Sequence, residues 1–373
     1  MRPVPDRALL PLPAQPEDVP WPGDAWPEAH PAELGADAAR LDALLDELVD
    51  GEHPVFGRTY AAAVVARGRL AAERVGERVV QDLRSLGDDP PFEPVDAASE
   101  LLSWSMAKSI TSLAVGVAAA DGALDVADRV PEPQWADPAD PRHAITWHHL
   151  LTMRPGLAWT EEYHDFSGDA LPDVITMLFG EGAADMGAYA ASMPLVAEPG
   201  SPEAFVYSSG TTNIIAANLQ RVLGLDAAGM DRFLRERLFD PIGFTTFRAD
   251  FDPAGTFIGS SYVWANLRDW CRFGLLAARG GRWDGRTIVP AAWLDDARTG
   301  RSWDDEILHG AQWWTWDQDQ MPFGAHGFEG QRIIAFPTRD VVVVRFGKTG
   351  PDHTTALNAH LTEIAGCFPE LGA

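Results

Sequence analysis

The chain has 373 residues, of which 55 are acidic and 29 are basic, so its formal net charge at neutral pH is −26. A surface this negative repels phosphate backbones, which argues against nucleic-acid binding. Apolar residues make up 46% of the chain, enough for a packed globular core. The two cysteines, Cys271 and Cys367, lie far apart and fit neither a disulfide framework nor a cysteine metal site.

The N-terminal stretch is rich in proline and acidic residues and lacks the apolar core of a signal peptide. No later stretch reaches the roughly 18 unbroken apolar residues that a membrane span needs. We therefore expect an extended arm over residues 1–32. We also expect a cytoplasmic location without membrane contact.

The regular elements alternate between helical and strand patterns along the chain. Leucines at helical spacing predict an amphipathic helix over Glu33–Val49, and a nearly continuous apolar run predicts a buried helix over Ser109–Ala120. Strands and turn residues predict hairpins near both ends of the chain. The expected strand pairs are Ala61–Ala66 with Leu70–Val75 around Arg67–Gly68, and Arg332–Phe336 with Val341–Phe346; further helices are expected at Val174–Phe179, Ile214–Leu223 and Thr355–Cys367.

This order of elements predicts an α+β fold with a discontinuous sheet domain. Residues 33–104 and 240–373 are expected to share one antiparallel sheet flanked by helices. Residues 105–239 are expected to form a mainly helical domain inserted between them. The active site would lie at the interface of the two.

Ser105-Met106-Ala107-Lys108 is the sharpest local motif. A spacing of three places the serine hydroxyl and the lysine amine on one helix face. The lysine can activate the hydroxyl only if burial or a cation lowers its pKa, and the apolar run that follows would bury it. Lys348 is the only other lysine in the chain, so a lysine here is an unusual choice. The simpler alternative is an N-capping serine followed by a surface lysine.

Two later segments complete a candidate catalytic group. Tyr207, which precedes Ser208-Ser209, could exchange a proton with Ser105 and the leaving group. By itself it could equally be a half-buried loop tyrosine. Ala325–Gln331 is a glycine-containing entrance to a strand, where the Phe328 N–H could join the Ser105 N–H as an oxyanion donor.

These motifs, in this order, resemble the β-lactamase-related serine hydrolases. That superfamily includes class C β-lactamases, D,D-peptidases, esterases and the 6-aminohexanoate-dimer (nylon-oligomer) hydrolases. The resemblance covers roughly residues 35–370 and includes Ile145–Leu157 and Arg268–Gly274. It implies a β-lactamase/transpeptidase-like fold in which Ser105 is acylated, Lys108 acts as base or tunes it, and Tyr207 assists proton transfer.

The resemblance also suggests which residues contact the substrate. Ser209 stands where β-lactamases usually have asparagine. A serine at this position is more like the esterase and nylon-oligomer branch. Ala325-His326-Gly327 replaces the Lys-Thr-Gly of β-lactamases, which removes the lysine that would hold a substrate carboxylate. His326 could face a ligand or be an ordinary strand histidine. Tyr163 is similar to a loop tyrosine that holds the substrate amide in nylon-oligomer hydrolases, and Asp173 to an acidic residue that receives a substrate ammonium.

We therefore expect a serine hydrolase that cleaves small carboxylic esters or amides through an acyl-enzyme on Ser105, without a metal or organic cofactor. Its partner would be a small-molecule ester or amide substrate. Whether the chain forms a homodimer is left open by the sequence. Lys348-Thr349-Gly350 spells the β-lactamase motif but follows the last expected strand, so a catalytic role for it is disfavoured. The alternatives are a β-lactamase or D,D-peptidase, an acyltransferase, and a non-catalytic ligand-binding protein of this fold.

Overall fold

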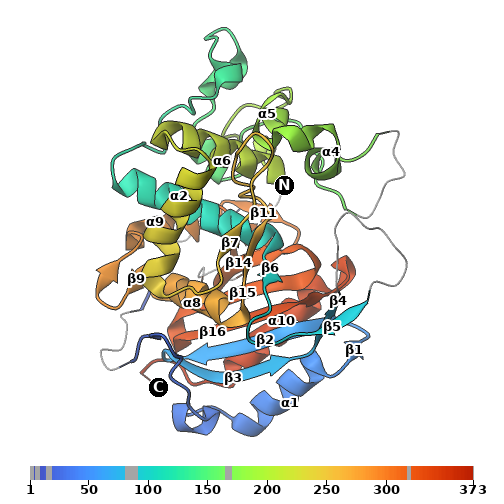
Figure 1. The fold of residues 1–373 in the computed structure, drawn as a ribbon, viewed down its shortest axis with the longest axis vertical. Coiled ribbons are helices and arrows are strands. Elements are labelled where there is room, and N and C mark those ends of the chain that lie inside the picture. The colour runs from blue at the N-terminus through green and yellow to red at the C-terminus, as the bar shows by residue number, and fades with distance from the viewer. Residues whose placement is uncertain are drawn as a thin grey trace.

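The computed structural model describes residues 4, 9–13, 19–79, 91–163, 170–316 and 321–372. A nine-stranded antiparallel sheet forms its lower half (Figure 1) and has the order β1-β2-β16-β15-β14-β13-β12-β11, with β3 also paired to β2. These strands are β1 (Glu52–His53), β2 (Gly57–Ala66), β3 (Arg69–Val75), β11 (Ser302–Asp304), β12 (Ile307–His309), β13 (Trp314–Thr315), β14 (Phe323–Gly327), β15 (Gln331–Phe336) and β16 (Val341–Lys348).

The two ends of the chain share this sheet because β2 pairs with β16. Both predicted hairpins are present, and the turn of the first one uses positive φ angles at Arg67 and Gly68. The α+β fold predicted from the sequence is therefore confirmed.

The central strands are mostly apolar because both faces of the sheet are buried. In β16, Val342 and Val344 belong to one hydrophobic core, whereas Val341 and Val343 belong to another. The first core contains α8 (Leu267–Ala278), and the second contains α1 (Ala38–Val49) and α10 (Thr354–Gly366). Helices thus cover the sheet on both sides (Figure 1).

The first helix starts later than the expected Glu33. Residues Pro31–Leu34 form a short 3₁₀ turn that ends at Gly35, whose φ of 79° is left-handed. Asp37 then caps α1 by accepting a hydrogen bond from the Arg40 backbone N–H at 3.1 Å. The leucine spacing identified the helix but not this break before it.

The middle of the chain is mainly helical and forms the upper half of Figure 1. The apolar run predicted as a buried helix is α2, whose residues from Ala107 to Ala118 are all buried. The helices in this half and around it are α2 (Ala107–Ala120), α3 (Trp147–Leu151), α4 (Asp173–Phe179), α5 (Met186–Ala191), α6 (Ser209–Leu223), α7 (Ala227–Leu234) and α9 (Ala291–Ala297). Short strand pairs complete the fold: β4 (Glu77–Val79) with β5 (Phe92–Pro94), β6 (Leu101–Leu102) and β7 (Arg248–Ala249) with β8 (Val263–Ala265), and β9 (Arg282–Trp283) with β10 (Arg286–Thr287).

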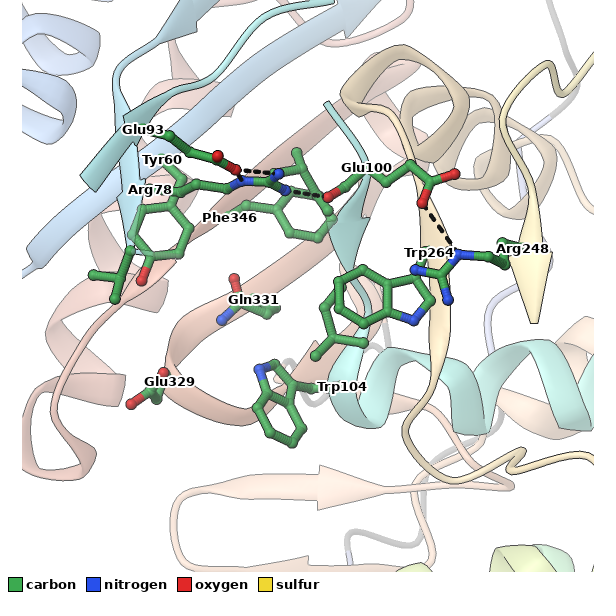
Figure 2. Close-up of a pocket in the computed structure, with 13 residues that line it drawn as sticks. Tyr60, Arg78, Glu93, Glu100, Trp104, Arg248, Trp264, Glu329, Gln331 and Phe346 are labelled. Carbon is green, nitrogen blue, oxygen red and sulfur yellow. Dashed lines mark hydrogen bonds and ion pairs between the residues drawn. The ribbon is translucent and has the colours of Figure 1, made fainter. Parts of the chain in front are cut away.

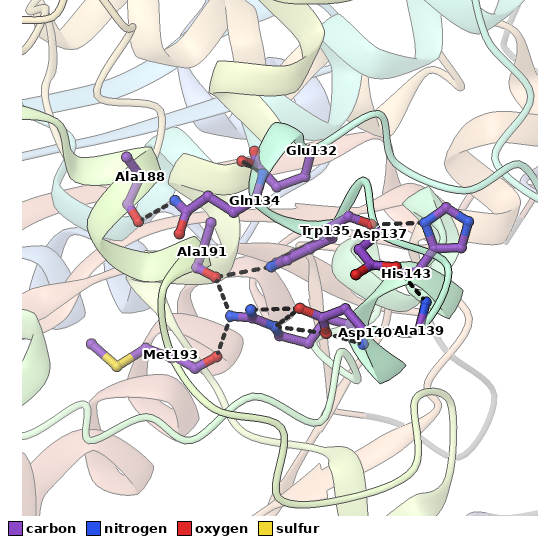
Figure 3. A network of polar contacts seen from close by, with 11 residues as sticks. Glu132, Gln134, Trp135, Asp137, Ala139, Asp140, His143, Ala188, Ala191 and Met193 are labelled. Carbon is purple, nitrogen blue, oxygen red and sulfur yellow. Dashed lines mark hydrogen bonds and ion pairs between the residues drawn. The ribbon is translucent and has the colours of Figure 1, made fainter.

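A polar network fixes the long connection between α2 and α3 (Figure 3). The Trp135 indole N–H donates to the Ala191 carbonyl at 2.9 Å, and Arg142 donates to the same carbonyl at 3.0 Å. Asp140 holds the Arg142 guanidinium at 2.7 Å. The connection is therefore anchored to the end of α5.

Buried arginines bind backbone carbonyls of the N-terminal arm. Arg272 donates to Pro22 and Gly23, Arg279 to Pro20, and Arg298 to Leu10. In the part of the chain that the structure describes, no helix has the length and apolar character needed to cross a bilayer.

Gly274 lets α8 pack closely on the sheet, so Gly274→Ala should destabilise the protein. A Cβ there would overlap Val342 and lie 2.8 Å from Ile333 Cγ2. We expect a loss of about 1–3 kcal/mol in the free energy of unfolding, measured by chemical denaturation. Gly366→Ala is the control, because a Cβ at the end of α10 meets nothing within 4 Å. Equal stabilities of the two variants would contradict this account of the packing.

Candidate active site

Ser105 lies where a short strand turns into a buried helix. β6 pairs with β8, and the Ser103 N–H donates to the Val263 carbonyl at 2.8 Å, which fixes the chain just before the serine. Trp104 then adopts a left-handed φ of 46° and opens a 3₁₀ turn that leads into α2. A bulky residue in this region is strained, and such strain is typical of functional sites. The turn leaves the Ser105 side chain half-buried, at the edge of a cavity.

Lys108 is only 2% exposed, and its ammonium group reaches three acceptors. It donates to Ser105 Oγ at 2.8 Å, to Ser209 Oγ at 2.9 Å and to the Ser260 carbonyl at 3.1 Å. Burial lowers the pKa of Lys108 to about 8, against the opposing effect of the nearby Glu161 carboxylate. This lysine can therefore lose its proton near neutral pH while in hydrogen-bond contact with the serine.

Tyr207 meets the same pair from the loop before α6. Its ring lies 4.9 Å from Lys108 Nζ, and its hydroxyl forms a hydrogen bond with Ser105. Burial raises the pKa of Tyr207 above its usual value, and the Ser105 bond partly opposes that rise. The phenol is therefore protonated at neutral pH and can relay a proton rather than begin as a base.

Glu161 is the acidic centre of the site, and the sequence analysis did not identify it. Its Oε1 accepts from Ser209 Oγ at 2.5 Å and from the Tyr163 hydroxyl at 2.8 Å. Its Oε2 accepts from the Trp159 indole at 2.6 Å and from the Ser209 N–H at 2.9 Å. Because Ser209 donates to Glu161 and accepts from Lys108, one hydroxyl connects the carboxylate to the ammonium.

Gly327 and Phe328 lie at the end of β14, against the turn that carries Ser105. A Cβ at Gly327 would come within 2.5 Å of the Ser103 carbonyl, so only glycine allows this approach. The Phe328 ring packs on Trp104 at 5.4 Å and on Tyr163 at 4.7 Å between centroids. Glu329, the next residue, has a left-handed φ of 57°. Residues with left-handed backbone therefore adjoin both Ser105 and Phe328.

A cavity of about 790 Å³ opens at Ser105, and most of the sequence-predicted residues line it. Lys108 and Ser209 stand behind it, since both are buried and neither lines the cavity. The predicted residues on its wall are Ser105, Tyr163, Tyr207, His326, Gly327 and Phe328. The structure thus places Ser209 where it supports Lys108, not where it touches a substrate.

Asp173 is the predicted residue that the geometry places elsewhere. Its carboxylate accepts from the Thr160 N–H at 2.8 Å and the Thr160 hydroxyl at 2.7 Å, and from the Tyr189 hydroxyl at 3.4 Å. It does not line the Ser105 cavity. Because these bonds fix the start of α4, Asp173 is not positioned to receive a substrate ammonium.

His326 lines the cavity between two tryptophan rings. Its ring stacks on Trp314 at 5.7 Å and meets Trp316 edge-on at 4.9 Å. Its Nε2 is enclosed and forms no hydrogen bond to the described residues. Burial, and secondarily the charge of Arg332, lower the pKa of His326 well below its usual value. It is therefore a neutral wall residue, not a replacement for the missing lysine.

Trp104 also lines a second cavity of about 230 Å³ (Figure 2). Four of the five charged residues that line this cavity pair with one another: Arg78 binds Glu93 at 2.6 Å, and Arg248 binds Glu100 at 3.2 Å (Figure 2). The fifth, Glu329, pairs with Lys348. This cavity contains no part of the Ser105–Lys108–Tyr207 group. This second cavity therefore lies beside the turn that carries Ser105, apart from the candidate catalytic group.

Lys348, in Lys348-Thr349-Gly350, lies outside the candidate catalytic group. Its side chain is 48% exposed and pairs with Glu329 at 3.5 Å. Lys348 does not line the Ser105 cavity. Across the described ranges, no group of three or more His, Cys, Asp or Glu side chains is arranged to hold a metal ion.

The comparisons with known proteins agree with this arrangement. The Beta-lactamase family model matches residues 43–365. A candidate 6-aminohexanoate-dimer hydrolase from Bacillus anthracis superimposes with a TM-score of 0.67 at 21% identity, over 87% of this chain and 81% of the other. A candidate beta-lactamase from Bacteroides dorei gives 0.66 at 15% identity, over 89% and 99%. A penicillin-binding protein homologue from Caulobacter crescentus gives 0.61 at 17% identity, over 87% and 97%.

No curated protein matches the chain in a sequence comparison. The structural matches, at these identities, establish the fold alone. The family model, in contrast, spans most of the chain and includes both Ser105 and Phe328. The chain belongs to the beta-lactamase family of serine hydrolases.

Proposed function

We propose that this protein is a serine hydrolase that cleaves small carboxylic esters or amides through an acyl-enzyme on Ser105, of the carboxylesterase and 6-aminohexanoate-dimer hydrolase type. The observation that carries the proposal is the 2.8 Å contact between Ser105 Oγ and the buried Lys108 amine. A serine needs such a base within hydrogen-bond reach, and burial supplies the lowered pKa that the base requires.

In the first half-reaction, Ser105 Oγ attacks the carbonyl carbon while its proton passes to the neutral Lys108 amine. The backbone N–H groups of Ser105 and Phe328 would hold the oxyanion. Collapse of the tetrahedral intermediate breaks the bond to the leaving group, which takes a proton delivered through the Tyr207 hydroxyl. The product of this step is the acyl-serine.

In the second half-reaction, a water molecule attacks the acyl-serine and gives its proton to the same base. The carboxylic acid product leaves, and the Ser105 hydroxyl is restored. The esterase and amidase preference over β-lactams rests on Ala325-His326-Gly327, where alanine replaces the lysine of β-lactamases and the histidine is neutral. The resemblance in fold to a candidate 6-aminohexanoate-dimer hydrolase supports the same choice.

Replacement of the nucleophile or the base should abolish hydrolysis. We expect Ser105→Ala and Lys108→Ala each to reduce kcat/KM for 4-nitrophenyl esters by at least about a thousandfold, because each removes an essential part of the acylation step. The measurement is a spectrophotometric assay, with thermal unfolding to verify the fold. Most of the activity surviving in either variant, with a normal melting curve, would rule out the assignment.

The pH dependence should report the Lys108 amine. The base is active when neutral, so kcat/KM should rise with pH to a plateau above about 8 and fall about tenfold per pH unit below it. Glu161→Gln removes the charge that holds this pKa up, so its acidic limb should move to lower pH.

Glu162→Gln is the matched control for this experiment. It removes the same charge from the next residue, which is solvent-exposed and therefore screened. Its profile should stay close to that of the wild type. An acidic limb in Glu161→Gln that coincides with the wild-type limb would refute the link between this carboxylate and Lys108.

A further inference from the structure

Arg332 is the only arginine or lysine among the described residues that line the Ser105 cavity. We propose that it binds a carboxylate of the substrate, and hence that the enzyme acts on esters or amides that carry a carboxylate group. This inference rests on the proposed function and extends it by naming a substrate class.

The hydrogen bonds of Arg332 leave one guanidinium nitrogen for a ligand. The side chain is only 3% exposed. Nε donates to Asn358 at 2.9 Å, and Nη1 donates to the carbonyls of Gly327 at 3.1 Å and Gln331 at 2.9 Å. Within the described residues, Nη2 has no acceptor, and no carboxylate pairs with the guanidinium. A buried cation without a counter-ion is costly, which suggests that the missing anion arrives with the substrate.

The other buried arginines show that this gap is specific to Arg332. The described part of the chain contains four further arginines in the buried class, and each uses its Nη2 in a hydrogen bond. The acceptors are Gly23 for Arg272, Asp340 for Arg279, Asp295 for Arg298, and Phe56 and Arg58 for Arg345. Arg345, which also has no carboxylate partner, satisfies all three nitrogens with Thr59 and backbone carbonyls.

Arg332 lies across the sheet from the counterpart of the Lys-Thr-Gly motif. Ala325 stands at the lysine position on β14, and the next residue, His326, has Arg332 on β15 as its cross-strand partner. Arg332 also holds the carbonyl of Gly327, the residue before the proposed oxyanion donor Phe328. The neighbouring strand thus carries a cation one residue out of register with the missing lysine. The N–H groups of Nη2 can donate charge-assisted hydrogen bonds to a carboxylate.

The remaining charges of the cavity limit the substrate to a single carboxylate. Its wall carries many carboxylates, which would repel a second anionic group: Glu161, Glu162, Asp304, Asp305, Glu306 and Glu363. Arg332 itself stays cationic, since burial lowers its pKa only to about 10 and Tyr207 opposes that decrease. The expected substrate therefore carries one negative charge, close to its scissile bond.

Two matched pairs of aryl esters test this inference. One pair is the 4-nitrophenyl monoester of adipic acid against its methyl-capped diester, with the charge on the acyl side. The other is 3-carboxyphenyl acetate against 3-carbamoylphenyl acetate, with the charge on the leaving group. We expect the wild type to favour the charged member of at least one pair by roughly tenfold or more in kcat/KM. The reason is that a neutral analogue would leave the buried Arg332 guanidinium unpaired.

Arg332→Met should lower kcat/KM for the charged member about tenfold more than for the neutral member, so that the ratio between them falls to about one, and Arg332→Lys should keep part of the preference. Arg248→Met, which removes an arginine from the second cavity, is the control and should behave as the wild type. A measurement without variants is the inhibition of neutral-ester hydrolysis in the wild type, where hexanoate should compete and hexanamide should not.

The outcomes separate this inference from the proposed function. Hydrolysis of neutral esters without preference for a carboxylate, equal inhibition by hexanoate and hexanamide, or an unchanged preference in Arg332→Met would overturn the role of Arg332 alone. Absence of hydrolysis for all four esters in the wild type would instead overturn the proposed function.

Discussion

The site depends on one buried ammonium group. Lys108 is enclosed by α2 and its neighbours, and its three donors are matched by Ser105, Ser209 and the Ser260 carbonyl. A charge in this position would be expelled without such partners, and a lysine in solvent would be too basic to activate a serine. The apolar helix that buries Lys108 is therefore also the feature that makes its chemistry accessible near neutral pH.

Glu161 connects the Lys108 ammonium, through hydrogen bonds, to a residue that lines the cavity. The same carboxylate oxygen binds Ser209, which contacts Lys108, and Tyr163, which lines the cavity beside Phe328. A ligand that displaced the Tyr163 hydroxyl would therefore change the environment of the counter-ion to the proposed base. In this way the helical half of the molecule, which supplies Ser105, Lys108 and Glu161, is coupled to the sheet half, which supplies Gly327, Phe328 and Arg332.

The sequence predicted the elements whose patterns are local. Both hairpins and the buried helix follow from β-branched runs, turn residues and apolar spacing, and the Ser-x-x-Lys motif lies within one helical turn. Glu161 and Arg332 were missed because their roles arise from contacts between distant segments. Glu161 lies two residues before Tyr163, which the sequence motif did identify. Arg332 is an isolated charge at the start of an apolar strand, and such a charge is a sequence signal of a functional residue. Asp173 was expected to contact the substrate, but its carboxylate binds Thr160 and lies outside the cavity. Sequence position alone does not reveal these bonds.

Active-site labelling tests the central claim most directly. The wild-type protein is treated with a fluorophosphonate, and the adduct is located by peptide mass spectrometry; the same treatment is applied to Lys108→Ala. We predict one adduct on Ser105 in the wild type and none in the variant, because an unactivated serine hydroxyl is a poor nucleophile. An adduct on another residue, or no adduct on the folded wild-type protein, would contradict the account.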